Sequence, residues 1–253
     1  TDEGIRQKFA QAWHIPVEKL DPQVGYRITE VPHLAIEGKV KAYYIMGEDP
    51  LQTEADLGLV RKGFQALDFI VVQDIFMTKT AEQADVILPS TSWGEHGGIF
   101  TCADRGFQRF EQAVQARGNV KRDWEIISLL ATAMGYPMSY TDNEEIWHEV
   151  RALCPLFFGA TYEKLAGLAH IQWPCPELDH PGTPYLYSDN RFTTPSGKGQ
   201  LFATAWRAPA ELPDDEYPMI LSTVREVGHY SCRSMTGNCK ALASLADEPG
   251  YVQ

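Results

Sequence analysis

Three polar side chains that can form strong hydrogen bonds follow directly on apolar stretches of the chain: Asp49, Gln73 and Asp74. Carboxylates accept hydrogen bonds, and a glutamine amide both donates and accepts them. These groups together can therefore bind a purine nucleotide. An aspartate in such a place also commonly caps a turn. This structural role is the alternative for Asp74 and for Asp49, which precedes Pro50.

Four further charged residues stand between the second apolar run and the middle of the chain. Asp85 is expected to hold the turn into the third apolar run. Glu95 and His96 resemble a catalytic pair, but no third partner is visible, so we expect a loop or core role. Asp123 precedes Trp124 and is a good helix N-cap, which competes with a binding role.

These side chains must be positioned by the segments around them. Residues 40–46, 69–72 and 86–89 are predicted strands, and Thr53 is a predicted N-cap for a helix between the first two. The apolar residues of this helix recur at three- and four-residue spacing, namely Leu57, Val60, Phe64 and Leu67. Strands that alternate with helices in this way predict a parallel α/β unit.

Ligands bind beyond the carboxyl ends of the strands in such a sheet, where this chain has residues 47–49, 73–74 and 89–92. We therefore expect a nucleotide site at this edge. No Gly-x-Gly-x-x-Gly sequence follows any of the three strands, which disfavours an NAD-binding module.

The rest of the chain predicts helices at residues 3–13, 124–134, 143–154 and 162–169, and a Pro-punctuated connection up to Gly38. Proline-rich residues 171–218 indicate an extended linker, and residues 217–223 predict the first strand of a further unit. We divide the chain into an α/β domain (1–91), a helical or irregular segment (92–184) and a linker with the beginning of another domain (185–253).

The formal charge of -12 disfavours a nucleic-acid partner, and the apolar runs are too short to span a bilayer. Five cysteines without a C-x-x-C pair indicate neither disulfides nor a structural zinc site, and no metal ligand is assigned. We expect reduced, mostly buried thiols in a cytoplasmic protein. Both ends of the sequence are expected to be cut from a longer protein.

Residues 47–50, 73–89 and 93–101, in this order and spacing, resemble the large subunits of the dimethyl-sulfoxide-reductase family. Residues 121–127 and 223–238 are similar to the bacterial formate dehydrogenases that are linked to a hydrogenase. The resemblance implies part of a molybdopterin-binding α/β domain with a parallel sheet and flanking helices, a helical insert, and the start of a C-terminal β-barrel-like domain.

The resemblance also implies roles for single residues. Asp49 and Thr53 match positions near the guanosine end of one cofactor, Gln73 and Asp74 match the loop that binds its ribose and base, and Asp123 matches a pterin contact. A fixed carboxylate can accept both the N1–H and N2–H2 donors of guanine, which discriminates it from adenine.

A second group of residues matches the segment near the other cofactor and the metal. Arg225 and His229 are the implied catalytic residues, and Glu226, Tyr230 and Ser231 join Arg225 as cofactor contacts. An arginine there, Arg225 or Arg233, can neutralise a pyrophosphate or orient a small carboxylate substrate through its bidentate fork.

The implied activity is oxidation of formate to carbon dioxide at a molybdenum or tungsten ion held by two molybdopterin guanine dinucleotides, in anaerobic metabolism. Electrons would pass through a 4Fe-4S cluster to an iron–sulfur subunit and a hydrogenase complex. The selenocysteine or cysteine on the metal and the cluster ligands match nothing in this chain, so the piece alone is expected to be inactive. The alternatives are a related enzyme such as a nitrate reductase, and a metal-free structural relative in a respiratory complex.

Overall fold

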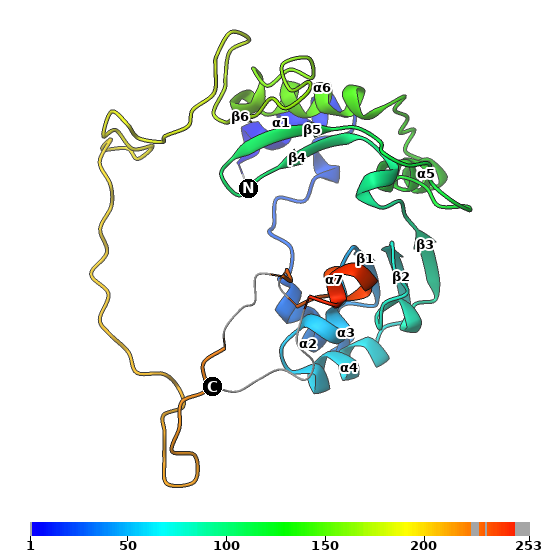
Figure 1. The fold of residues 1–253 in the computed structure, drawn as a ribbon, viewed down its shortest axis with the longest axis vertical. Helices are drawn as coiled ribbons and strands as arrows, with labels where there is room; N and C mark the ends of the chain where they lie inside the picture. Colours follow the sequence, from blue (N-terminus) through cyan, green and yellow to red (C-terminus); the bar gives the residue numbers. More distant parts are fainter. Residues whose placement is uncertain (1, 224–227, 231, 246–253) are drawn as a thin grey trace. The chain divides into compact units, whose positions relative to one another are not determined.

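The structure is a computed structural model that describes residues 2–223, 228–230 and 232–245. The chain divides into two compact units, of which the first ends at Pro184 and the second begins at Tyr185 (Figure 1). Each unit is described by itself. The three-part domain division expected from the sequence stays a prediction.

A parallel sheet of three strands, in the order β1-β2-β3, forms one part of the first unit. The strands are β1 (Ala42–Met46), β2 (Phe69–Asp74) and β3 (Val86–Pro89). Met46 pairs with Gln73, and Asp74 pairs with Pro89, so the carboxyl ends of neighbouring strands lie side by side. The predicted parallel α/β architecture is confirmed.

Short helices connect these strands. They are α3 (Pro50–Thr53) and α4 (Leu57–Gln65) between β1 and β2, and the 3-10 turn η3 (Ala81–Gln83) between β2 and β3. The predicted N-cap Thr53 is wrong: this residue ends α3. Asp56 caps α4 instead, because its carboxylate accepts a hydrogen bond from Leu59 N at 3.1 Å.

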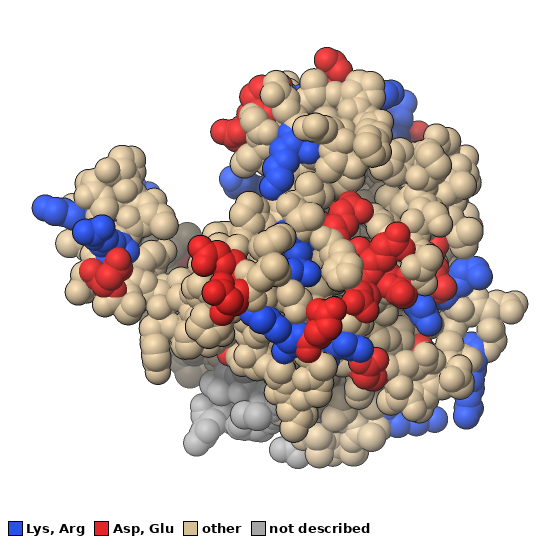
Figure 2. Space-filling view, turned by 90° about the horizontal axis from the view of Figure 1, so that it is seen from above, with Lys and Arg blue, Asp and Glu red and all other residues tan. Residues whose placement is uncertain are grey.

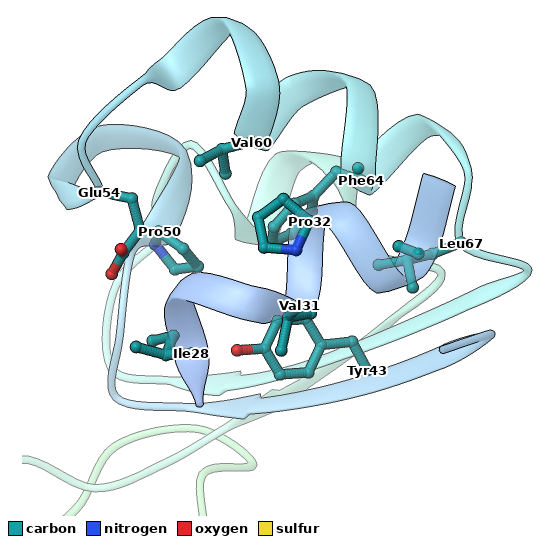
Figure 3. Close-up of a pocket in the computed structure, with 11 residues that line it drawn as sticks. Ile28, Val31, Pro32, Tyr43, Pro50, Glu54, Val60, Phe64 and Leu67 are labelled. Carbon is teal, nitrogen blue, oxygen red and sulfur yellow. The ribbon is translucent and has the colours of Figure 1, made fainter. Parts of the chain in front are cut away.

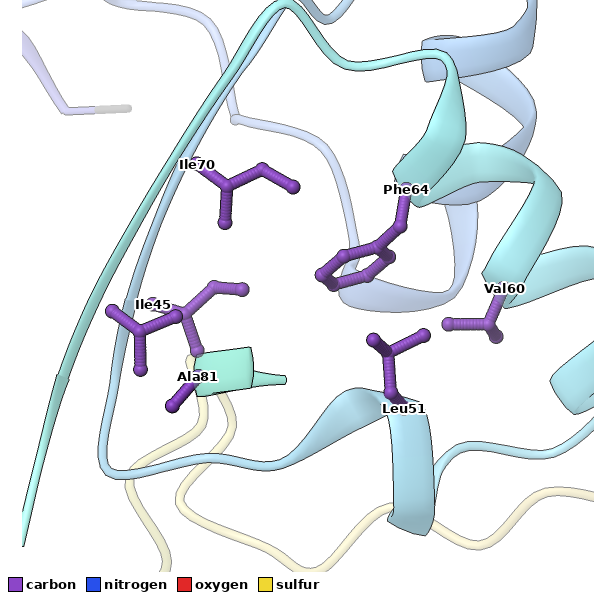
Figure 4. Close-up of a cluster of buried hydrophobic side chains, with 7 residues drawn as sticks. Ile45, Leu51, Val60, Phe64, Ile70 and Ala81 are labelled. Carbon is purple, nitrogen blue, oxygen red and sulfur yellow. The ribbon is translucent and has the colours of Figure 1, made fainter. Parts of the chain in front are cut away.

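Mostly aliphatic side chains from both helices and from the sheet meet with Phe64 in one core (Figure 4). Val60 and Phe64 of the predicted helix face are buried there, together with Ile45 and Ile70 of the strands. This burial is what holds α4 on the sheet, since apolar area removed from water is the main stabilising contribution.

Helix α2 (Val31–Ile36), which the sequence did not predict, packs on α4. The two helices approach so closely that a Cβ on Gly63 would lie 2.6 Å from the Cα of Pro32. A pocket beneath α2 is lined by Val31, Tyr43 and other mainly apolar residues (Figure 3). It lacks the convergent polar groups that a nucleotide requires, and we interpret it as a packing gap.

A second, antiparallel sheet has the order β4-β5-β6, with β4 (Gly98–Thr101), β5 (Gly106–Phe110) and β6 (Ile171–Gln172). The sequence predicted only helical or irregular structure for residues 92–184, so this sheet was not expected. The helix predicted at residues 162–169 is wrong, because these residues form turns, but three other predicted helices are confirmed. These are α1 (Glu3–Ala12), α5 (Asp123–Ala133) and α6 (Asn143–Leu153).

The core beside this sheet is aromatic. Phe107 is fully buried, and its ring makes edge contacts with Trp147 at 5.0 Å and with Phe157 at 4.9 Å between centroids. Trp147 Nε1 donates a hydrogen bond to the carbonyl of Ala160 at 2.7 Å. The polar edge of the indole is therefore satisfied inside the cluster.

The second unit contains little regular structure in its described part, which has the 3-10 turn η6 (Thr236–Asn238) and α7 (Lys240–Ala243). The strand predicted at residues 217–223 is not formed. Met219, Ile220 and Leu221 are 85%, 78% and 85% exposed. A strand requires a hydrogen-bonded neighbour, and residues 217–223 have none in the described chain. The expected barrel-like domain stays a prediction.

The remaining 3-10 turns are η1 (Val17–Lys19), η2 (Ile28–Glu30), η4 (Trp93–Glu95) and η5 (Pro155–Phe157). None of the helices in the described residues is long and apolar enough to cross a bilayer. All five cysteines are free, but only Cys175 is buried, so the expectation of mostly buried thiols is wrong. On the face in Figure 2, acidic and basic side chains lie interspersed.

Candidate functional site

The carboxyl ends of β1, β2 and β3 form a common rim. Gly47 N donates to the carbonyl of Gln73 at 2.9 Å, and Ser90 N donates to the carbonyl of Asp74 at 3.2 Å. Gly47 has a φ of +66°, which favours glycine, and a Cβ there would meet no atom within 4 Å. The chain thus turns away from β1 and leaves open space beside it.

Asp49 is 2% exposed, and its carboxylate is held inside the protein. Its Oδ1 accepts hydrogen bonds from Thr80 N at 3.0 Å and from Thr80 Oγ1 at 2.7 Å. Thr80 Oγ1 in turn accepts one from Leu51 N at 3.1 Å. Asp49 therefore ties the loop after β1 to the loop after β2, and makes no side-chain cap on α3.

Thr53 lies one turn after Asp49 on α3. Its Oγ1 donates to the carbonyl oxygen of Asp49 at 3.1 Å, and its backbone N–H donates to the same oxygen at 3.0 Å. The two residues predicted at the guanosine end are thus brought together by one short helix.

Gln73 is fully buried, and its side-chain amide links Tyr44 on one side to Asp123 on the other. Tyr44 donates its hydroxyl hydrogen bond to Gln73 Oε1, and Gln73 Nε2 donates to Asp123 Oδ1 at 2.6 Å. The amide therefore fixes two groups at the rim. Burial, followed by the nearby charge of Asp123, raises the pKa of Tyr44, so its hydroxyl stays protonated as a donor.

Asp123 reaches the rim because the chain returns to the end of β3. Ser90 and Lys121 form a parallel bridge, and Thr91 N donates to the carbonyl of Lys121 at 3.0 Å. Helix α5 begins at Asp123, but its N-cap is Arg122, whose N–H donates to Glu125 at 2.9 Å. The helix N-cap considered for Asp123 is therefore wrong, and its carboxylate faces Gln73.

Asp74 is the half-buried carboxylate of the rim. Its Oδ1 accepts a hydrogen bond from Phe76 N at 2.8 Å, which is the turn-capping role considered from the sequence. Burial raises the pKa of Asp74, backbone N–H groups of Phe76 and Ile75 oppose this, and the charges of Asp49 and Asp123 raise it further. Hydrogen-bond donors from a ligand would stabilise this carboxylate.

Two buried polar atoms beside the rim have no partner among the described residues. They are Oγ1 of Thr91, which follows β3, and Nε1 of Trp124, in the first turn of α5. Buried polar atoms are normally hydrogen-bonded, and an exception suits a position that a polar ligand completes.

Tyr44 and Thr80 were not predicted as part of this site, and Thr91 was predicted there only as a member of the loop at residues 89–92. Tyr44 alternates with the buried Ile45 on β1, and this alternation was a usable signal for a side chain on the other face. The roles of the two threonines depend on contacts between separate loops, for which the sequence carries no local signal.

The expected structural roles of three residues are confirmed. Asp85 Oδ2 accepts a hydrogen bond from Ile70 N at 2.7 Å and so holds the start of β3 against β2. Glu95 accepts from Ser92 N at 2.9 Å, and this hydrogen bond is the main cause that lowers its pKa. His96 Nδ1 lies 2.9 Å from the carbonyl of Gly97, and its ring packs on Phe110.

The second predicted group lies in the second unit. Arg225, Glu226 and Ser231 fall outside the described residues. His229 Nδ1 lies 2.8 Å from Thr236 Oγ1, while its Nε2 is buried without a partner among the described residues. Tyr230 is 83% exposed.

Known proteins resemble this chain along its whole length. A family model described as molybdopterin oxidoreductase matches residues 7–133. Formate dehydrogenase H of Escherichia coli is 62% identical over 254 residues, which cover 100% of this chain and 35% of that protein. The alpha subunit of formate dehydrogenase 1 of Methanococcus maripaludis is 39% identical over 98% of the chain and 36% of its own length.

A formate dehydrogenase alpha subunit of Methanocaldococcus jannaschii is 42% identical over 91% of the chain and 34% of its own length. The chain thus spans about a third of the length of these relatives. Acetylene hydratase from Pelobacter acetylenicus has a similar fold, with a TM-score of 0.53 and 24% identity, over 67% of this chain and 23% of that one.

Proposed function

The chain belongs to the molybdopterin oxidoreductase family, and on this premise we propose that it is the part of a formate dehydrogenase that holds one guanine-dinucleotide arm of the pterin cofactor. The observation that supports this most directly is the rim of the parallel sheet. There Asp74 lies half-buried beside the carboxylates of Asp49 and Asp123.

Asp74 is the residue that we assign to the guanine base. Guanine presents N1–H and N2–H2 side by side. Hydrogen bonds from these donors would stabilise the ionised Asp74 carboxylate, whose pKa burial raises. Adenine has no donor at N1, so the same carboxylate would reject it. This is the physical reason for a guanine rather than an adenine nucleotide.

The other rim residues have supporting roles in the proposal. Asp49 and Thr53 shape the loop at the guanosine end through Thr80, since the carboxylate of Asp49 is already hydrogen-bonded there. Gln73, which is fully buried, presents Asp123 to the pterin side of the cofactor.

When bound, the molybdenum or tungsten ion with its two pterin guanine dinucleotides supplies the redox chemistry that takes formate to carbon dioxide. Arg225 and His229 would stand near the metal and orient formate, and Glu226, Tyr230 and Ser231 would join Arg225 around the second cofactor. The proposal includes a 4Fe-4S cluster, an iron–sulfur partner subunit, a hydrogenase complex and a cytoplasmic location.

The test uses the full-length protein that carries this chain. Asp74→Ala should lower the guanine nucleotide released per protein on acid hydrolysis, and formate oxidation with a viologen dye should fall in parallel. Asp68→Ala is the matched control, because Asp68 is exposed at the opposite end of β2. Full guanine content in Asp74→Ala would contradict the assignment.

The same full-length protein tests whether formate is the substrate and whether the protein is a metal-containing enzyme. Turnover of nitrate without turnover of formate would replace the formate proposal with a nitrate reductase of the same family. A full-length protein without molybdenum or tungsten by elemental analysis would indicate a structural relative. Calorimetric binding of NAD would indicate an adenine-dinucleotide module instead.

A further inference from the structure

Three potential metal ligands meet at the antiparallel sheet, where no role has yet been assigned. Cys102 Sγ, a carboxylate oxygen of Asp104 and an imidazole nitrogen of His170 all lie within 4.8 Å of one another. His170 Nε2 is 3.4 Å from Asp104 Oδ2. None of the three belongs to the rim of the parallel sheet.

The fold brings these residues together from distant parts of the chain. Cys102 and Asp104 lie in the turn between β4 and β5, while His170 directly precedes β6. The pairing of Gly106 with Gln172 aligns β6 with β5 and sets the histidine beside the turn. The cysteine spacing in the sequence carried no sign of this arrangement.

Two features hold the ligands in place. Asp104 Oδ1 accepts a hydrogen bond from Gly106 N at 3.0 Å, and Gln172 Nε2 lies 3.3 Å from Asp104 Oδ2. A Cβ on residue 106 would lie 1.6 Å from His170 Nε2, so glycine at this position leaves room for the ring where it now lies. Such supporting contacts orient metal ligands in proteins.

The ligand types select the ion. Thiolate, imidazole and carboxylate together suit zinc and similar divalent transition metals, whereas calcium and magnesium prefer oxygen alone. Tetrahedral zinc has ligand bonds of about 2.0–2.3 Å, which places its ligands roughly 4 Å or less apart.

We propose that Cys102, Asp104 and His170 form a binding site for one zinc-class divalent cation, with water in the fourth position. The bound ion would cross-link the turn between β4 and β5 to the start of β6. This cross-link would close a loop of nearly seventy residues. Because the ligands are partly or fully exposed, the ion would exchange with solvent. This site is independent of the proposed formate dehydrogenase activity.

The experiment titrates the full-length protein that carries this chain with cobalt(II), followed as a difference spectrum, and then displaces the cobalt with zinc(II). One equivalent of cobalt should give the near-ultraviolet absorption band of a cobalt–thiolate bond. Cys102→Ser should abolish the band, and His170→Ala should weaken zinc binding by at least ~100-fold, since loss of a ligand exceeds loss of a supporting contact. Gln172→Leu, which removes a supporting contact, should weaken it by about 10-fold.

Two control variants make the same kinds of substitution at other positions in the chain. Cys154→Ser and His148→Ala should bind cobalt and zinc like the unmodified chain, because neither residue has two further ligands beside it in the described structure. Circular dichroism of each variant checks that it folds. A thiolate band that persists in Cys102→Ser, or zinc affinity unchanged in a folded His170→Ala, would overturn the proposal.

Discussion

The two sheets of the first unit are stabilised in different ways. The parallel sheet has a mainly aliphatic core and gathers polar side chains at the carboxyl ends of its strands. The antiparallel sheet has an aromatic core, and Cys102, Asp104 and His170 lie outside that core, in the turn between β4 and β5 and directly before β6. The parallel sheet thus buries polar groups next to its candidate site, whereas the antiparallel sheet keeps them outside its core.

This contrast has an energetic consequence. A buried carboxylate such as Asp49 requires partners, and Thr80 supplies two hydrogen bonds to it. The aromatic cluster requires only one indole hydrogen bond and close packing. Substitutions should therefore act through packing in the antiparallel region and through hydrogen bonds at the rim.

The largest effect is expected for Phe107→Ala. Removing this fully buried ring leaves a cavity against Trp147 and Phe157 and should lower the free energy of unfolding by about 3–5 kcal/mol. Urea denaturation followed by tryptophan fluorescence measures it. Phe100→Ala, at a ring that is 47% exposed in the same sheet, should cost about 1 kcal/mol. Equal losses of unfolding free energy in the two variants would contradict the role that we assign to close packing around Phe107.

The next largest effect is expected for Thr80→Val. The variant keeps the shape of the side chain but removes the hydroxyl that donates to the buried Asp49 carboxylate, which should cost about 1.5–3 kcal/mol. Thr91→Val is the matched control, because the buried Thr91 hydroxyl has no partner among the described residues. Chemical denaturation should show little change for Thr91→Val. A similar loss in both variants would contradict the importance of the rim hydrogen bonds.

The smallest effect is expected for Asp74→Asn, and it has the opposite sign. The raised pKa of Asp74 means that the folded chain holds this proton more tightly than the unfolded chain does. Ionised Asp74 therefore opposes folding above its folded pKa, and this opposition disappears below the unfolded value of 3.8. The variant should be more stable than the unmodified chain at neutral pH, with a gap that narrows as the pH falls toward 3.8 in urea denaturation. Lower stability of the variant at neutral pH would show that the rim is optimised for folding rather than for a ligand.

Much of the parallel sheet could be predicted because its signals are local. Each strand is a short β-branched or aromatic run, and the apolar spacing of α4 marks the face that Val60 and Phe64 bury. In the antiparallel sheet, β4 and β5 form a local hairpin that was not predicted, whereas β6 pairs with β5 only about sixty residues later in the chain. No short window of sequence contains both β5 and β6.

The sequence by itself determined which residues follow the three parallel strands, because strand order and crossover direction place their carboxyl ends at one edge. Only the tertiary structure decided what each residue does there. It buries Asp49 against Thr80, joins Gln73 to Asp123 through the bridge between Ser90 and Lys121, and leaves Asp74 half-buried. Hydrogen bonds between separate loops depend on positions in space, and the order of residues along the chain does not specify them.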